Sequence, residues 1–273
     1  MTTWRGRAEP VFPPLGPRGW VRVLLRGLPL AMLVFGGLIL MLMLRLLERP
    51  IYGLHRPWTQ YITQFVCRCT FVILGIGFRV EGAPMRERGA VVSNHSSWLD
   101  IFALNARKRI YFVSKAEVAG WPGIGWLARA TGTVFISRYA RDAAAQKSMF
   151  EARLLAGHKL LFFPEGTSTD GSLVLAFKST LFAALFTQNL RDTLSVQPVT
   201  VVYSGPGGAE DRFYGWWGDM DFAPHLLQVL GARRQGSVRL IYHAPLKVAD
   251  FTDRKALAKA CEDAVHSGMG TAE

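Results

Sequence analysis

A histidine and an aspartate stand five positions apart, directly after a short apolar run. They are His95 and Asp100, and the run is residues 90–93. A neutral imidazole is well matched to removing a proton near pH 7, and a carboxylate on its other ring nitrogen would fix its tautomer. The two positions lie about 140° apart on a helical wheel, so the side chains meet only if His95 precedes a helix and Asp100 lies in its first turn. The spacing therefore predicts a general base at the end of a strand.

Three later blocks contain apolar runs of the same kind. Residues 133–136 lead into Arg138, and residues 160–163 lead through a proline into Glu165. A further apolar run covers residues 196–202. Such runs are typical of buried strands that deliver polar groups to the rim of a sheet.

Apolar runs and helical stretches alternate through the middle of the chain. Strands are predicted at residues 90–93, 110–113, 133–136, 159–163, 196–202 and 238–242. Helices are predicted at residues 97–105, 141–156, 180–187 and 253–265. Continuous apolar strands separated by helices predict an α/β fold with a mainly parallel sheet flanked by helices. The aromatic tract at residues 117–126 has no clear period, and we expect it to pack in the core, with lining of an apolar substrate tunnel as the alternative.

The first sixty residues combine positive charge with apolar sequence. They carry eight arginines and two glutamates, a net of +6 out of +12 for the whole chain of 273 residues. Residues 27–44 form an 18-residue stretch without a charge, with arginines on both flanks. Eighteen residues is short for crossing a bilayer, and the balanced arginines favour both ends on the cytoplasmic side. A membrane-dipping helix, or a helix pair without full crossing, is the preferred interpretation, and a single span is the alternative.

The same charge pattern predicts partners and domain organisation. A basic excess beside apolar sequence suits anionic lipid headgroups, so we expect an anionic membrane surface as a partner. Zinc-finger spacing, an RNP-like aromatic motif and a basic helix with polar interleaving are absent from the sequence, so we expect no nucleic acid. We predict a basic leader with a membrane-associated helical segment at residues 1–77 and a catalytic domain at residues 78–273.

The cysteines and histidines do not predict a metal site. Cys67 and Cys69 are too close for an ordinary disulfide, and Cys261 stands alone in the sequence. The sequence holds no four-ligand cluster of cysteine and histidine. We therefore expect free thiols in a reducing compartment and no metal.

In their order and spacing, the blocks between Phe78 and Tyr242 resemble the glycerolipid acyltransferase superfamily, and within it the PlsC-like 1-acylglycerol-3-phosphate acyltransferase family. The resemblance implies a membrane-associated enzyme that transfers a fatty acyl chain from an acyl carrier protein or coenzyme A thioester to the hydroxyl of a lysolipid. It implies no cofactor beside that co-substrate, and a catalytic domain facing the cytoplasm at a bacterial inner membrane. His95 would take the hydroxyl proton, and Asp100 would hold the imidazole. Because the sequence has no Gly-x-Ser-x-Gly elbow, we expect no acyl-enzyme intermediate.

The resemblance also places the acceptor site in the block that begins at Glu165. This carboxylate would bind acceptor hydroxyls or hold the site together, and Gly166 and Thr167 would line the same site. Arg138 and Lys178 would contact anionic groups of the substrates or remain solvated cations.

One position departs from the family pattern. Many members that acylate lysophosphatidic acid continue Glu-Gly-Thr-Arg, with an arginine well placed to hold the acceptor phosphate, whereas this chain has Ser168. A serine there, with Asp170 nearby, is similar to the subgroup that acylates lyso-ornithine lipid, whose headgroup has an ammonium and no phosphate. Both acceptors remain open, and a catalytically silent lipid-binding protein of the same fold is the alternative function.

Overall fold

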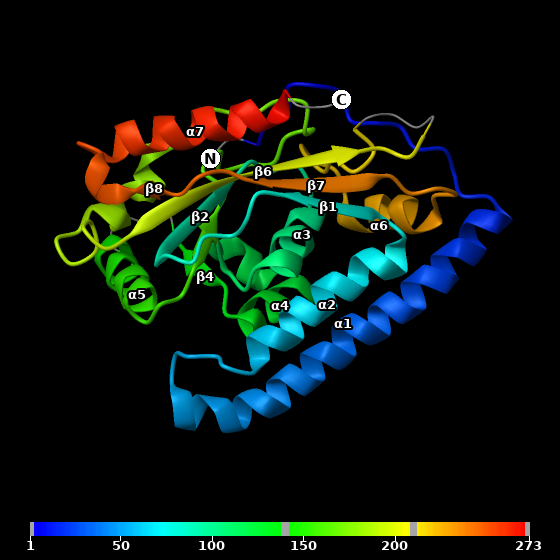
Figure 1. The fold of residues 1–273 in the computed structure, drawn as a ribbon. Coiled ribbons are helices and arrows are strands. Elements are labelled where there is room, and N and C mark those ends of the chain that lie inside the picture. The colour runs from blue at the N-terminus through cyan, green and yellow to red at the C-terminus, as the bar shows by residue number, and fades with distance from the viewer. Residues whose placement is uncertain (1–2, 138–141, 208–211, 271–273) are drawn as a thin grey trace.

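One mainly parallel sheet forms the centre of the protein. The computed structural model describes residues 3–137, 142–207 and 212–270. Within these residues the strand order is β1-β7-β6-β2-β5-β3-β4, with β8 beside β6 (Figure 1). Only the pairs of β6 with β7 and with β8 are antiparallel in this part of the chain. The strands are β1 Gly77–Glu81, β2 Gly89–Ser93, β3 Tyr111–Lys115, β4 Val134–Ile136, β5 Leu160–Phe162, β6 Ser195–Ser204, β7 Ser237–Tyr242 and β8 Leu246–Lys247.

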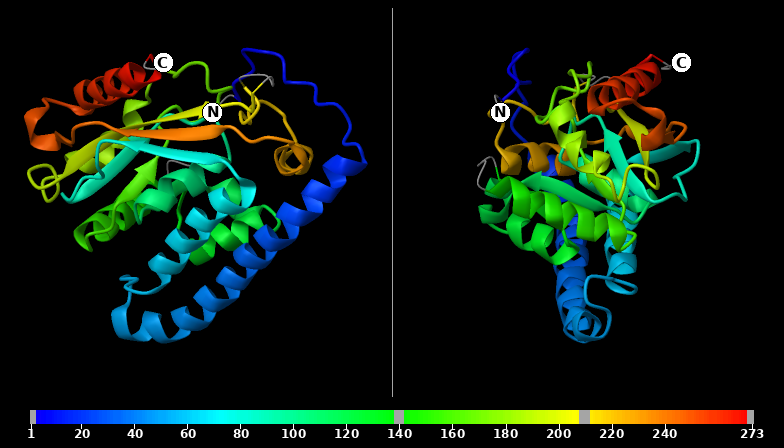
Figure 2. Two further views of the ribbon diagram at one scale, coloured as in Figure 1. Left: turned by 45° about the vertical axis from the view of Figure 1, so that its right-hand side comes forward. Right: turned by 90° about the vertical axis from the view of Figure 1, so that its left-hand side faces the viewer.

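Helices cover both faces of the sheet (Figures 1 and 2). Side chains of β2 alternate between the faces, as the strand period requires. Ala90 and Val92 join an apolar cluster with α5 and α7, whereas Val91 joins a second cluster with α2 and α3. The α-helices are α1 Pro17–Tyr52, α2 Thr59–Leu74, α3 Leu99–Arg107, α4 Ile124–Thr131, α5 Ala143–Leu155, α6 Phe222–Gly231 and α7 Arg254–Met269.

The helices α1 and α2 form a hairpin along one side of the domain (Figure 2). Its turn is held by Glu48, whose carboxylate accepts hydrogen bonds from the backbone N–H groups of Trp58 at 2.8 Å and Thr59 at 3.1 Å. The hydroxyl of Thr59 donates to the same carboxylate at 2.6 Å, and Arg45 donates to it at 3.1 Å. A carboxylate at this position satisfies N–H groups that the start of α2 leaves unpaired.

The first half of α1 is joined to α6. Arg22 Nε donates to the carbonyl of Gly231 at 2.6 Å, and Arg26 Nη1 donates to those of Leu230 at 2.9 Å and Ala232 at 2.7 Å. These carbonyls lie at the carboxyl end of α6, where a helix lacks internal partners and favours cations. The N-terminal helix is therefore fixed to residues more than 200 positions later in the chain.

The predicted fold class is confirmed, and each of the six predicted strands is present within two residues of its expected bounds. Strands β1 and β8 were not predicted. The helix predicted at residues 180–187 is not an α-helix, because the segment Ser179–Phe186 forms a 3-10 helix. In that helix Phe182 and Leu185 are three positions apart and both buried, as the tighter period requires.

The aromatic tract was also misread. Trp126 is 66% exposed, so the expectation that this tract packs in the core was wrong. Residues from Ile124 onward form α4, which lies between Gly123, with φ 70°, and Gly132, with φ 82°. Eight residues bounded by glycines are too short for a helical period to stand out in the sequence. The predicted boundary after residue 77 stays a prediction.

Candidate active site

His95 and Asp100 meet at the end of β2. His95 follows the strand and Asp100 lies in the first turn of α3, as the five-residue spacing predicted. The distance between His95 Nδ1 and Asp100 Oδ2 is 2.7 Å. Because Nδ1 is held by the carboxylate, the ring takes the tautomer that leaves Nε2 as the proton acceptor.

The carboxylate of Asp100 is fully buried and held by four donors. Besides the imidazole, Oδ2 accepts from the backbone N–H groups of Ser96 at 2.9 Å and Ser97 at 3.0 Å, while Oδ1 accepts from the hydroxyl of Tyr203 at 2.9 Å. Burial, followed by the charge of Asp100, raises the pKa of Tyr203 well above its ordinary value, so this hydroxyl stays protonated and donates. The four contacts fix the position of the carboxylate against the imidazole.

Further contacts hold the ring and the backbone of His95 in place. Its ring stacks on Phe163 with the centroids 4.0 Å apart and the planes 11° from parallel. The carbonyl of His95 accepts from the N–H of Thr169 at 2.9 Å. The preceding Asn94 pairs through both amide atoms with the backbone of Val201 on β6, at 2.8 and 2.9 Å. The side chain keeps 21% of its surface exposed.

Glu165 bridges two loops. One carboxylate oxygen accepts from the N–H of His95 at 2.7 Å, and the other accepts from the N–H of Leu175 at 2.8 Å. Burial raises the pKa of Glu165 to about 8, while these two N–H donors act in the opposite direction. The side chain thus holds the backbone of His95 in place, and holding the site together is one of the two roles considered for Glu165 from sequence. Its contact with the acceptor stays a prediction.

The loop after Glu165 turns back beside the base. Gly166 has φ 72°, a conformation that favours glycine, and its N–H donates to the carbonyl of Phe163 at 3.0 Å. Thr167 and Ser168 follow and are half-buried. The hydroxyl of Thr167 accepts from the backbone N–H of Trp4 at 3.4 Å, so the N-terminal leader, residues 3–16, reaches this loop.

Asp170 is occupied by the protein's own groups. Its Oδ1 accepts from the N–H and hydroxyl of Ser172 at 3.0 and 2.6 Å, and its Oδ2 lies 3.6 Å from Arg7 and 3.9 Å from Arg212. The side chain is fully buried. An acceptor ammonium would have to displace Arg7 and Arg212 to reach Asp170, so Asp170 does not favour a phosphate-free acceptor as was expected from the sequence.

Arg138 and Lys178 are the two cations predicted for the site. Arg138 lies outside the described residues. Lys178 is half-buried, and its charge acts to lower the pKa of Glu165, against the larger effect of burial. Its backbone N–H donates to the carbonyl of Pro164 at 3.0 Å. Substrate contact by either cation stays a prediction.

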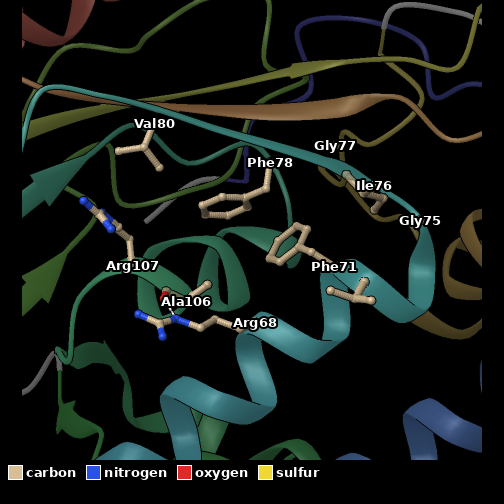
Figure 3. Close-up of a pocket in the computed structure, with 10 residues that line it drawn as sticks. Arg68, Phe71, Gly75, Ile76, Gly77, Phe78, Val80, Ala106 and Arg107 are labelled. Atoms are coloured by element: carbon tan, nitrogen blue, oxygen red, sulfur yellow. Dashed lines mark hydrogen bonds between the residues drawn. The ribbon is translucent and has the colours of Figure 1, made fainter.

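An apolar cavity lies elsewhere on the domain. It has a volume of about 690 Å³ and lies between α2, β1 and the end of α3 (Figure 3). Phe71 and Phe78 approach one another in its wall, and Arg68 crosses its rim to donate to the carbonyl of Ala106 at 2.8 Å. Its lining includes none of the residues predicted for the active site.

Three contributors to the site were missed by sequence reasoning. Tyr203 lies at the end of β6, Phe163 follows β5, and the leader contacts the acceptor loop. Tyr203 stands directly after the predicted strand at residues 196–202, so the rule that polar groups follow strands could have marked it as a candidate, although not its contact with Asp100. In the part of the chain that the structure describes, no three side chains of His, Cys, Asp or Glu gather as they would around a metal ion.

Comparison with known proteins identifies a family model and several sequence relatives. The model of the Acyltransferase family matches residues 77–202. A lyso-ornithine lipid O-acyltransferase from Rhodobacter capsulatus is 57% identical over 98% of this chain and 97% of its own length. A protein of the same name from Pseudomonas aeruginosa is 36% identical over 92% and 95%. A 1-acyl-sn-glycerol-3-phosphate acyltransferase from Neisseria meningitidis is 30% identical over 73% and 77%.

The fold has a solved counterpart. The crystal structure of the 1-acyl-sn-glycerophosphate acyltransferase PlsC from Thermotoga maritima matches 92% of this chain and 95% of its own, with a TM-score of 0.66 and 22% identity. Sequence relatives and fold together define the chain as an acyltransferase. It belongs to the PlsC-like glycerolipid acyltransferase family, which confirms the resemblance.

Proposed function

We propose that this chain is a lyso-ornithine lipid O-acyltransferase, which moves a fatty acyl chain from an acyl carrier protein or coenzyme A thioester to the free hydroxyl of lyso-ornithine lipid. The observation that carries the proposal is the 57% identity to a protein of that name over almost the full length of both chains. Ser168, in place of the arginine expected for a phosphate-bearing acceptor, supports the same choice.

The geometry supports a mechanism in which one residue of the chain, His95, first accepts a proton and then returns it. His95 Nε2 takes the proton of the acceptor hydroxyl as its oxygen attacks the thioester carbonyl carbon. Asp100, 2.7 Å from Nδ1, stabilises the imidazolium that results. When the tetrahedral intermediate collapses, the carbon–sulfur bond breaks and the imidazolium returns the proton to the leaving thiolate. The new ester and the free thiol are the products, and His95 is neutral again.

A substitution at Ser168 tests the acceptor. Ser168→Arg is expected to raise the specificity constant for lysophosphatidic acid relative to lyso-ornithine lipid by about ten- to a hundredfold, because a guanidinium beside Glu165 supplies the charge-assisted phosphate contact that serine lacks. The measurement is the ratio of the two kcat/KM values for native and variant protein in the same detergent, with acyl carrier protein and coenzyme A thioesters each offered as donor.

Ser168→Gln is the matched control, since it adds length without charge and should leave the acceptor ratio near the native one. A native enzyme that strongly prefers lysophosphatidic acid, with a ratio that Ser168→Arg does not move, would reassign the chain to phosphatidic acid synthesis. Because both acceptors use the same base, that outcome would change the acceptor and not the reaction.

The proposal includes attachment to the cytoplasmic face of a bacterial inner membrane. In the described part of the chain one helix, α1, meets the length and composition of a membrane span, and its most apolar 18-residue window has a mean hydropathy of 2.5 with 6% of the window buried. The exposed side chains include Leu28, Phe35 and Met43. One face of α1 packs along α2 and α6. The opposite, apolar face is exposed over much of its length, where lipid can contact it.

The membrane placement predicts a protease result. In sealed inverted vesicles of the inner membrane, protease added outside should cut the catalytic domain, because that face corresponds to the cytoplasm where thioester donors are made. A known periplasmic domain in the same vesicles should stay protected and serves as the control. Cleavage that occurs only from the periplasmic side would contradict the placement.

A further inference from the structure

A second pocket lies at the tip of the α1–α2 hairpin, away from the active site. Its volume is about 470 Å³, and its walls come from the hairpin turn, the segment before β3 and the segment before β5. His95 follows the carboxyl end of β2, whereas Tyr111 and Lys159 lie at the amino ends of β3 and β5, which run parallel to β2 in the same sheet. The pocket therefore lies at the amino ends of these parallel strands, and His95 lies at the opposite end of the sheet.

Positive charge is concentrated in this pocket. Four cations line it, and no acidic side chain of the described residues does. The nearby Glu48 is buried in its own hydrogen bonds at the start of α2. Burial and repulsion between neighbouring cations together lower the pKa of Arg56 to about 10 and that of Lys159 to about 8. The four cations are Arg56, Lys108, Arg109 and Lys159.

A buried histidine in the same wall lacks a partner. His158 is 6% exposed, and neither of its ring nitrogens has a hydrogen-bond partner among the described residues. Its ring is held between Tyr111, at 4.4 Å, and His55, at 6.0 Å. Burial and the surrounding arginines lower the pKa of His158 to about 3, so the ring is neutral and offers one N–H donor. A buried donor without a partner costs stability unless a ligand satisfies it.

The surroundings of the pocket indicate where such a ligand comes from. Ile51 is 65% exposed and Leu54 49%, both at the turn that forms the pocket wall. Trp58 is 41% exposed and packs edge-on against Tyr52, which lines the pocket. Exposed aliphatic side chains with tryptophan and tyrosine are typical of segments that sit at the level of lipid headgroups. The pocket therefore lies beside a segment of the kind that is found at the level of phospholipid phosphates.

We propose that this pocket binds the phosphate group of an anionic phospholipid, with Lys108, Arg109 and Arg56 around the anion and the N–H of His158 donating to it. The site is distinct from the acceptor site and does not depend on which lysolipid is acylated. Its effect is to hold the hairpin tip on an anionic membrane.

Flotation of the full-length protein on preformed vesicles tests the proposal. One set of vesicles is phosphatidylcholine, and the other contains equal parts phosphatidylcholine and phosphatidylglycerol. Lys108→Gln combined with Arg109→Gln is expected to weaken binding to the anionic vesicles by about thirtyfold, because each lost cation contributes about fivefold and the two effects multiply. Binding to phosphatidylcholine alone should be unchanged.

Two further variants separate a built site from diffuse attraction. His158→Phe keeps a ring against Tyr111 and changes no charge at neutral pH, yet it removes the donor and should weaken anionic vesicle binding by about tenfold. Lys247→Gln combined with Lys255→Gln removes the same charge from exposed sites at β8 and α7 and should leave binding within about threefold of native. Thermal unfolding confirms that each variant is folded.

The outcomes divide cleanly. Loss of anionic vesicle binding in both pocket variants, with turnover on micellar substrate retained, would support the site. Equal losses in the pocket pair and in the Lys247/Lys255 pair, or native binding by a folded His158→Phe, would overturn it in favour of diffuse surface attraction. Weakened use of acyl carrier protein by the pocket variants, with vesicle binding intact, would overturn the lipid assignment. If His158→Phe does not fold, the comparison of the two double variants decides.

Discussion

His95→Ala is expected to lower turnover by about 10²- to 10⁴-fold while the protein remains folded and membrane-associated. The reason is that His95 Nε2 is the group positioned to accept the acceptor proton, with Nδ1 held at 2.7 Å by Asp100. The side chain packs on one ring, that of Phe163, and keeps 21% of its surface exposed, so its loss removes little of the core.

The measurement is kcat with a saturating lysolipid and thioester, alongside thermal unfolding of the same preparation. His266→Ala, on the exposed side of α7, is the matched control and should retain native turnover. Near-native turnover in a folded His95→Ala protein would contradict the mechanism. A native protein that binds lysolipids and turns over none of them would favour the catalytically silent lipid-binding alternative.

Asp100→Asn is expected to be at least as damaging, with a fall in kcat of about 10³- to 10⁴-fold. Oδ2 accepts from two backbone N–H groups and faces the imidazole, so an amide NH₂ placed there meets donors it cannot accept from. If the amide turns round, its NH₂ faces the hydroxyl of Tyr203, which also donates to the native carboxylate. In either orientation the imidazolium loses its counter-charge.

Tyr203→Phe provides a graded comparison for the aspartate. It removes one of the four contacts to Asp100 and leaves the charge in place, so we expect a fall of about tenfold in kcat with little change in KM. Tyr203 acts through Asp100 and does not touch substrate in this scheme. An effect on KM alone, or native kcat for Asp100→Asn, would contradict the positioning role of the carboxylate.

The parts of the site that are close in sequence could be predicted, and those that depend on sheet order could not. His95 and Asp100 are joined by one strand-to-helix turn, so spacing alone indicated their contact. Tyr203 reaches Asp100 only because β6 lies beside β2, although 103 positions separate the two residues. The bond from Leu175 to Glu165 depends on how a loop without regular structure returns to the site.

The fold shows the same division. Continuous apolar strands such as residues 196–202 stand out because both faces are covered, and β6 is buried over most of its length. The helix α6 was missed because Pro224 and a short, largely apolar run gave no helical signature. Strand β1 alternates between exposed and half-buried residues at the edge of the sheet, so it lacks the continuous apolar run used to find the others.

The long reach of the N-terminal segment has a consequence for the order of assembly. Arg26 pairs with a carbonyl 204 positions later, and Arg5 with a side chain 214 positions later. At about 5 to 20 residues per second, synthesis of these partners follows the start of the chain by on the order of 10 to 40 s. During that interval α1 has no α6 to pack against, so the carbonyls that Arg22 and Arg26 bind are not yet available. The leader can therefore dock beside the loop that follows Glu165 only near the end of translation, which makes this contact one of the last to form.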